Sequence, residues 1–151
     1  MLFRSVEITE SVLLAANSIN LATLHELRSL GVRISLDDFG VGFSSLSYLR
    51  SFPFGKIKID RSFTRDVVGS RHVAAIVKAM TTLSKSLDMV ITAEGVETEA
   101  QFDCLRELGV DEAQGYLMSP ARPARDVEAM LRPDRHLTLV GAALPLISAA
   151  R

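Results

Sequence analysis

Hydrophobic positions change their spacing several times along the chain, and these changes predict alternating strands and helices. At residues 32–37 and 56–60 hydrophobic and polar residues alternate with a period of two, which is typical of a strand. At residues 71–87 the hydrophobic residues recur every three or four positions, which is typical of an amphipathic helix. Residues 89–93 form a continuous apolar run, as expected for a strand covered on both faces.

The complete pattern predicts an α/β fold. Strands are expected at residues 2–8, 32–37, 56–60, 89–93 and 113–118. Helices are expected at residues 11–30, 71–87, 99–108 and 125–131, with a short additional helix that ends before Pro53. Strands separated by helices favour parallel pairing with right-handed crossovers. Two architectures remain open, a doubly wound open sheet and a (β/α) barrel.

Composition supports a globular domain with a hydrophobic core. The chain has 151 residues, of which 48% are hydrophobic, and its net charge is −1. This apolar content is too high, and the charge too low, for a disordered chain. The near-zero charge gives no reason to expect duplex nucleic acid or an anionic membrane as a partner. The single cysteine, Cys104, fits a structural thiol in a reducing, cytoplasmic compartment.

Carboxylates recur at the ends of the predicted strands. Lys58 and Gln114 lie near the same strand ends as the acids, which are Glu7, Glu10, Asp37, Asp38, Asp60, Glu94 and Glu97. The C-terminal ends of parallel strands share one edge of a sheet, where barrels and open α/β sheets have their active sites. Carboxylates that gather there raise one another's pKa unless a cation compensates. Oxygen ligands alone favour Mg²⁺, Mn²⁺ or Ca²⁺.

These residues predict a metal-assisted phosphoester hydrolase. Two divalent cations can clamp the attacking and leaving oxygens of a phosphoryl displacement, and Lys58 would supply positive charge to the nucleophilic water or the transition state. For any single acid the alternative is a helix N-cap or a solvated loop charge. Recurrence at four successive strand ends favours the site. Arg61, Arg65 and Arg71 could contact a phosphate, although a solvated helix face is the stronger expectation for them.

Six short segments, in this order and spacing, resemble motifs of the EAL domain family, the cyclic di-GMP phosphodiesterases. They are Glu-Ile-Thr-Glu-Ser at 7–11, Leu-Asp-Asp-Phe-Gly at 36–40, Ser-Ser-Leu at 44–46, Lys-Ile-Lys-Ile-Asp at 56–60, Thr-Ala-Glu-Gly-Val-Glu-Thr at 92–98 and Gln-Gly-Tyr-Leu at 114–117. The resemblance implies a partial (β/α) TIM-like barrel with about five parallel strands alternating with helices.

The resemblance also implies roles for individual residues. Glu7, Asp37, Asp38 and Glu94 resemble metal ligands, with Asp37 bridging two ions. Lys58 and Glu94 resemble the catalytic residues, namely the lysine that contacts the nucleophilic water and the essential acid. Glu97, Gln114 and Asp60 resemble supporting positions. Glu10 resembles the glutamate that anchors the loop at residues 39–45.

The implied activity is hydrolysis of cyclic di-GMP to linear pGpG at a two-metal site that holds Mg²⁺ or Mn²⁺, with Ca²⁺ as an inhibitor. The implied partners are cyclic di-GMP, a second copy of the chain in a homodimer or other self-association, and sensory or GGDEF-type domains upstream in a longer parent. Such upstream domains could anchor the parent to a membrane.

Two features of the family pattern are absent from the chain: the Glu-Ala-Leu tripeptide and the asparagine ligand expected before Glu7. Residues 1–132 are therefore expected to be the C-terminal part of an EAL-type domain, and residues 133–151 an unassigned tail. The alternative function is a catalytically inactive, truncated domain that binds cyclic di-GMP or dimerises as a signalling module. About five strands cannot close an eight-stranded barrel, so the exposed strand edges predict self-association, partial order or low solubility.

Overall fold

Five parallel strands form one sheet in the computed structural model, which describes residues 5–14, 18–42, 49, 52 and 54–130. The strands are β1 (Ser5–Thr9), β2 (Arg33–Phe39), β3 (Lys56–Ile59), β4 (Val90–Glu94) and β5 (Glu112–Gln114). The helices are α1 (Glu10–Leu14), α2 (Ser18–Ser29), α4 (Arg61–Asp66), α5 (Arg71–Ser86), α6 (Glu99–Leu108) and α7 (Ala124–Met130). No helix in these ranges is both long and apolar enough to cross a bilayer.

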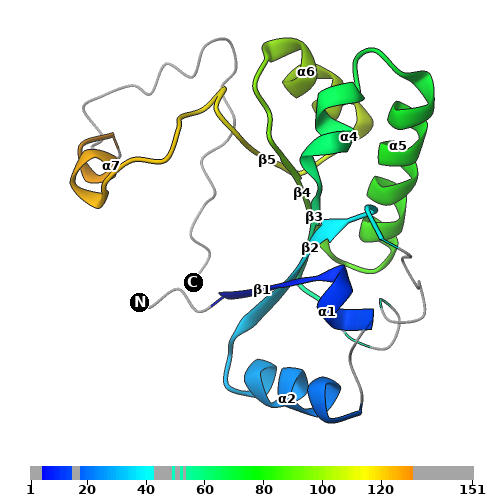
Figure 1. Ribbon diagram of the computed structural model, residues 1–151, viewed down its shortest axis with the longest axis vertical. Helices are drawn as coiled ribbons and strands as arrows, with labels where there is room; N and C mark the ends of the chain where they lie inside the picture. The colour runs from blue at the N-terminus through cyan, green and yellow to red at the C-terminus, as the bar shows by residue number, and fades with distance from the viewer. Residues whose placement is uncertain (1–4, 15–17, 43–48, 50–51, 53, 131–151) are drawn as a thin grey trace.

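The order of the strands distinguishes between the two architectures that the hydrophobic pattern left open. Each strand pairs in parallel with the next strand in sequence, in the order β1-β2-β3-β4-β5. A doubly wound sheet reverses its strand order at a switch point, whereas a barrel adds each strand on the same side. Figure 1 shows α4, α5 and α6 together on one side of the sheet. The predicted fold class, a partial (β/α) TIM-like barrel, is therefore confirmed.

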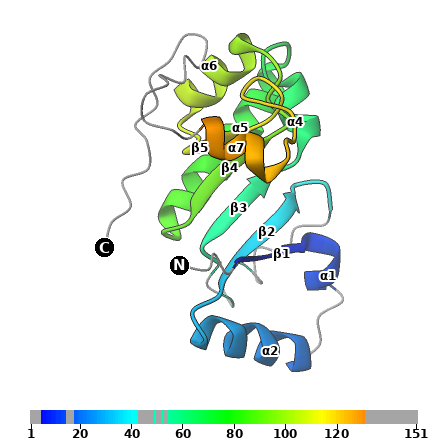
Figure 2. The ribbon, with the colours of Figure 1, turned by 90° about the vertical axis from the view of Figure 1, so that its left-hand side faces the viewer.

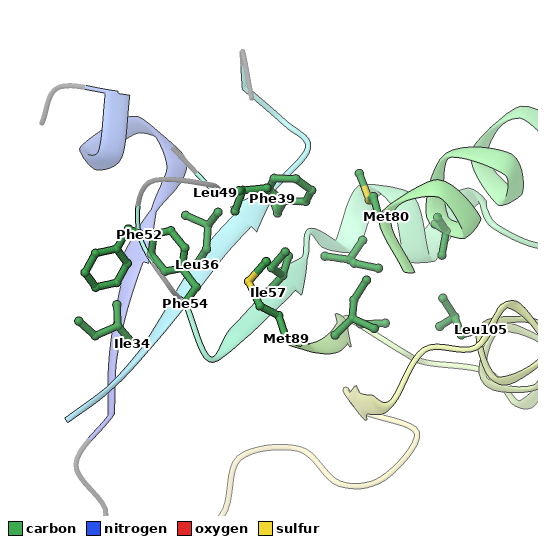
Figure 3. Close-up of a cluster of buried hydrophobic side chains, with 14 of the residues drawn as sticks. Ile34, Leu36, Phe39, Leu49, Phe52, Phe54, Ile57, Met80, Met89 and Leu105 are labelled. Carbon is green, nitrogen blue, oxygen red and sulfur yellow. The ribbon is translucent and has the colours of Figure 1, made fainter. Parts of the chain in front are cut away.

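The helix-facing side of the sheet carries the hydrophobic core. Ile34 and Leu36 from β2 and Ile57 from β3 are almost completely buried, together with Met80 from α5 and Leu105 from α6. Figure 3 shows these side chains converging between the sheet and the helices. Burial of each large aliphatic side chain stabilises the fold by about 1.5–3 kcal/mol. The core therefore fixes β2, β3 and β4 against α5 and α6.

The opposite face of the sheet is polar, because successive side chains of a strand point to opposite faces. The register pairs Lys58 with Thr92, and Thr92 with Glu112, so these three side chains share that face. Lys58 is 6% exposed and Thr92 is 4% exposed, which places charged and hydroxyl groups away from water. In a (β/α) barrel this face is the interior.

Two predicted elements have different boundaries in the structure. Instead of one helix at residues 11–30, the structure has α1 and α2, separated by residues 15–17, which lie outside the described part of the chain. The strand predicted at residues 113–118 ends at Gln114. After it, the backbone N–H of Leu117 donates to the carbonyl of Val96 at 3.0 Å, and the N–H of Met118 donates to the carbonyl of Gly115 at 3.2 Å. The second hydrogen bond closes a turn, and the first ties this turn to the loop after β4, although the residues are hydrophobic enough for a strand.

Helix α4 was expected only through the helix face assigned to Arg61 and Arg65, without bounds, and several predictions fall outside the described residues. Helix α4 begins directly after β3, where the sequence pattern showed no helical period. The short helix before Pro53, residues 43–45 of the loop at residues 39–45, and the tail at residues 133–151 fall largely or wholly outside the described part of the chain.

Candidate active site

Lys58 lies at the centre of a cluster of carboxylates on the polar face of the sheet. Its Nζ is 2.8 Å from Oε2 of Glu7, 3.2 Å from Oδ1 of Asp37 and 2.6 Å from Oε1 of Glu94. These partners come from β1, β2 and β4, so the cluster draws together strands on both sides of β3. The Lys58 side chain is only 7% exposed, which limits screening of these ion pairs by solvent.

The carboxylates keep Lys58 protonated. Burial alone would lower the pKa of Lys58, because it disfavours the charged form. The hydrogen bonds to Glu7, Glu94 and Asp37, together with the negative charge of Glu94, outweigh burial and raise the pKa above its ordinary value. The ammonium group can therefore donate hydrogen bonds at neutral pH but cannot act as a base.

Three carboxylates form a group that could hold a metal ion. One oxygen each from Asp37, Asp38 and Glu94 lies within 4.8 Å of the others. Neighbouring residues in a regular strand point to opposite faces, but Asp38 has a left-handed φ of 53° and the β2–β3 register shifts between Leu36 and Phe39. This irregularity places the carboxylates of both Asp37 and Asp38 close to that of Glu94. The backbone N–H of Asp38 also donates to Oδ1 of Asp37 at 3.1 Å.

The charge balance of the cluster fits a divalent cation. Glu7, Asp37, Asp38 and Glu94 bring four carboxylates near a single ammonium group, Lys58, so negative charge is in excess. The donor atoms are all oxygens, which Mg²⁺, Mn²⁺ and Ca²⁺ prefer. The side chains of Asp37 and Glu94 are each 22% exposed, so an ion can reach them from solvent.

Glu10 lies behind this cluster, as the first residue of α1 rather than the last of β1. It is 5% exposed, and its Oε2 accepts a hydrogen bond from the backbone N–H of Gly40 at 3.4 Å. A Cβ added at Gly42 would lie 3.1 Å from the Glu10 carboxyl carbon. Oε1 of Glu10 is buried and has no hydrogen-bond partner among the described residues. Glu10 therefore packs against the beginning of the loop that follows Asp38.

Asp60 has a local structural role. It is the N-cap of α4, and its Oδ1 accepts a hydrogen bond from the backbone N–H of Ser62 at 2.9 Å. Burial alone would raise the pKa of Asp60, but the hydrogen bonds from Ser62 and Arg61 outweigh it and hold the pKa below its ordinary value. The alternative weighed for a single strand-end acid, a helix cap, describes this residue.

The two remaining candidate residues lie near the same edge. Gln114 ends β5 in register with Glu94. Glu97 is exposed in the loop after β4, and it lines a cavity of about 460 Å³ beside the end of β3. Arg61 and Arg65 from α4 line the same cavity, so two of the arginines assigned to a solvated helix face border a hollow that Asp60 and Gly95 also line.

The structure contains polar contacts that sequence reasoning missed. Lys56 forms an ion pair with Glu112 across β4, and the Thr92 hydroxyl donates to Oε2 of Glu112 at 2.8 Å. No sequence pattern pairs residues of non-adjacent strands. A second missed feature is the capping box of α6, formed by Thr98 and Gln101. The Thr-x-x-Gln spacing would have indicated it.

The cysteine and the described histidines lie outside the carboxylate cluster. Cys104 is partly buried on α6, and its Sγ is 3.8 Å from the carbonyl oxygen of Val67. Burial, together with the charge of Glu107, raises the pKa of the thiol, which makes it a poor nucleophile. His25 and His72 are exposed on helices, and His136 lies outside the described residues.

The chain belongs to the EAL domain family, because the family model described as "EAL domain" matches residues 5–121. Protein y4lL of Sinorhizobium fredii is 52% identical over 127 residues, covering 84% of this chain and 15% of that protein. The bifunctional diguanylate cyclase/cyclic di-GMP phosphodiesterase MucR of Pseudomonas aeruginosa is 43% identical over 124 residues, covering 82% of this chain and 18% of that protein. The chain thus spans less than a fifth of the length of these two relatives.

Solved structures agree with this assignment. The structure of the MucR phosphodiesterase in complex with c-di-GMP superposes with a TM-score of 0.77 at 42% identity, covering 82% of this chain and 50% of that chain. The manganese/cyclic di-GMP complex of Klebsiella pneumoniae BlrP1 superposes with a TM-score of 0.73 at 34% identity, covering 77% of this chain and 30% of that chain. The predicted membership is confirmed, and this chain corresponds to part of an EAL domain.

Proposed function

We propose that this chain supplies the carboxylates and the lysine of a metal-dependent site that hydrolyses cyclic di-GMP to linear pGpG. The observation that carries the proposal is the convergence of Glu7, Asp37 and Glu94 on the buried Lys58. Membership in the EAL domain family, with a relative named as a cyclic di-GMP phosphodiesterase, supports this substrate. We assign the site to the domain formed by residues 1–132.

Glu7, Asp37, Asp38 and Glu94 would hold Mg²⁺ or Mn²⁺ in a two-metal site. When bound, such cations neutralise charge on a phosphodiester and make a water molecule a stronger nucleophile. Ca²⁺ would occupy the same oxygens and inhibit. The excess of carboxylates over the single ammonium group is the physical reason that this cluster would attract two divalent ions.

Lys58 is proposed to orient the nucleophile. Because its pKa is raised, Lys58 remains an ammonium group, and a hydrogen bond to the attacking water would replace one of its three carboxylate contacts. Glu94, within 2.6 Å of that ammonium, would accept the proton that the water loses. The water oxygen bonds to phosphorus, the P–O bond to one ribose oxygen breaks, and that oxygen takes up a proton from solvent, which balances the proton that the water gives to Glu94.

The supporting residues border the site or hold the elements around it. Asp60 caps α4 and so fixes the end of β3 next to Lys58. Gln114 and Glu97 border the site from β5 and from the loop after β4. Glu10 would anchor the loop at residues 39–45 through Gly40.

An assay of the whole chain tests the proposed function. Cyclic di-GMP and Mn²⁺ are incubated with the wild-type chain, and linear pGpG is measured by chromatography. We expect turnover by the wild type and a loss of roughly 100-fold or more in Glu94→Gln and Lys58→Met, the scale of removing one positioned proton acceptor or charge. Glu107→Gln, an exposed carboxylate on α6, is the matched control and should retain full activity. Absence of product from the wild type, or full turnover by Glu94→Gln, would contradict the proposal.

A second candidate function is binding without hydrolysis, and the c-di-GMP complex of the similar MucR phosphodiesterase supports binding by this fold. In this alternative the domain binds cyclic di-GMP without hydrolysing it, or dimerises, as a cytoplasmic signalling module controlled by sensory or GGDEF-type domains of a longer parent. Binding measured calorimetrically in Ca²⁺, together with no pGpG formation in Mn²⁺, would favour it over the hydrolase.

A further inference from the structure

A second polar network lies one layer below the carboxylate cluster, on the same face of the sheet. Lys56 on β3 forms an ion pair with Glu112 on β5, and Oε2 of Glu112 also accepts a hydrogen bond from Thr92 on β4. Thr92 is 4% exposed, whereas the side chains of Lys56 and Glu112 are 32% and 31% exposed. Three adjacent strands are therefore joined by side chains in addition to their backbone ladders.

The network crosses β4 diagonally. The register places Lys56 beside Val90 and places Glu112 beside Thr92, two residues further along β4. Neighbouring strands lie about 4.8 Å apart, so Lys56 and Glu112 begin about two strand spacings apart and must both lean over β4 to meet. Contact over the buried Thr92 fixes both the spacing and the relative register of β3, β4 and β5 on this face.

Each member of the network lies two residues before a residue of the candidate active site. Lys56 precedes Lys58, Thr92 precedes Glu94, and Glu112 precedes Gln114. Residues two apart in a strand point to the same face, about 6.6 Å further along. The network and the site are thus consecutive layers carried by the same three strands.

We propose that Lys56, Thr92 and Glu112 are positioning residues, a staple across β4 that aligns Lys58, Glu94 and Gln114 for metal binding and catalysis. This inference rests on the proposed function of the upper layer. The distance of 2.6 Å between Nζ of Lys58 and Oε1 of Glu94 depends on the alignment of β3 with β4, which the staple fixes one layer below. The loss of residues that orient metal ligands typically weakens metal affinity by about 10–100-fold.

Binding of Mn²⁺ to the whole chain tests the staple without depending on turnover. Mn²⁺ affinity is measured by titration calorimetry for the wild type, Glu112→Gln and Lys56→Met, at a temperature where each is folded by circular dichroism. We expect both variants to bind Mn²⁺ about tenfold more weakly. The double variant Lys56→Glu with Glu112→Lys restores an ion pair across β4 and should recover most of that loss. If Glu112→Gln does not fold, Lys56→Met carries the same test, because it leaves the hydrogen bond between Thr92 and Glu112 in place.

A stability control separates positioning from a general loss of folding. Val77→Ala removes a fully buried side chain from α5, on the helix-covered side of the sheet, and should lower stability with unchanged Mn²⁺ affinity. Wild-type affinity in Glu112→Gln or in Lys56→Met, or an equal loss in Val77→Ala, would overturn the staple alone. A wild-type chain that binds no Mn²⁺ would instead overturn the proposed function, and the link from the staple to a metal site would fall with it.

Discussion

Lys58 illustrates at the residue scale how a charged side chain can be buried in this sheet. Lysines are rarely buried unless they are paired, and here Glu7, Asp37 and Glu94 provide three partners. The sequence predicted this convergence, because the alternation at residues 56–60 places Lys58 at a strand end and parallel strand ends share an edge. Asp60 was harder to interpret, since an acid that follows a strand can face the site or cap the next helix, and here it caps α4.

Gly115 offers a sharp prediction at the same scale. A Cβ at this position would lie 2.1 Å from the carbonyl oxygen of Val96 and 2.3 Å from its nitrogen, so the backbone would have to move. Gly115→Ala should therefore lower the free energy of unfolding by about 1–3 kcal/mol, the usual result of overpacking. Urea unfolding followed by circular dichroism measures the change.

The matched control is Gly69→Ala, because no atom lies within 4 Å of the Cβ that it adds. Its stability should stay within about 0.5 kcal/mol of the wild type. Equal stability of the two variants would show that the close approach of Gly115 to Val96 does not constrain the turn after β5.

At the scale of elements, periodicity predicted the long segments better than the short ones. Helix α5 and strand β4 have enough residues for a hydrophobic period to emerge, and they begin and end within one residue of the prediction. Strand β5 is three residues long because hydrogen bonds to the backbone of Val96 end it, and these lie outside any local pattern. Helix α4 has only six residues, too few for a hydrophobic period, so the sequence indicates it through its N-cap residue, Asp60.

The link between β3 and β5 makes stability depend on pH. Burial alone would raise the pKa of Glu112, but the hydrogen bonds from Lys56 and Thr92 and the charges of Lys56 and Arg33 hold it below its ordinary value. Because the pKa is lower in the folded state, Glu112 contributes stability above the unfolded pKa of about 4.3, and this contribution is lost as pH falls through the folded pKa. Glu112→Gln should thus be less stable than the wild type at pH 7 by up to about 1 kcal/mol, a small value because the pair is partly exposed.

Urea unfolding at two pH values checks this sign. The difference between Glu112→Gln and the wild type should shrink as the pH falls through the folded pKa of Glu112, because the carboxylate becomes protonated. Glu107→Gln on α6 removes an exposed carboxylate and serves as the control, with little difference at either pH. A difference between Glu112→Gln and the wild type that grows in acid would contradict the proposed role of the ion pair.

At the scale of the whole molecule, the sheet is open. Among the described residues β1 and β5 each pair on one side only, so both present backbone groups along an edge. Figure 2 shows the strands side by side, with α7 in front of the β4 and β5 end of the sheet, on the opposite side from α4, α5 and α6 in Figure 1. The family and the barrel type followed from motifs spread along the chain, whereas the layered polar face required the register of the strands.

The open edges predict self-association of this chain. Exposed strand edges readily pair with another chain. Among the described residues, no further strand pairs with the outer edge of β1 or of β5. Sedimentation velocity at increasing protein concentration should show dimers or larger species. A single monomeric species that also unfolds cooperatively on heating would contradict this prediction.

Among the described residues, every strand pairs with its immediate neighbour in sequence, and helices lie between β1 and β2, between β3 and β4, and between β4 and β5. Each parallel pair joins positions 20 to 34 residues apart along the chain, so the sheet forms between successive segments. A chain of this kind can assemble progressively as it leaves the ribosome, because each new strand finds its partner strand already synthesised. Glu94 comes from β4, the fourth of the five strands, so the carboxylate cluster is completed only late in that assembly.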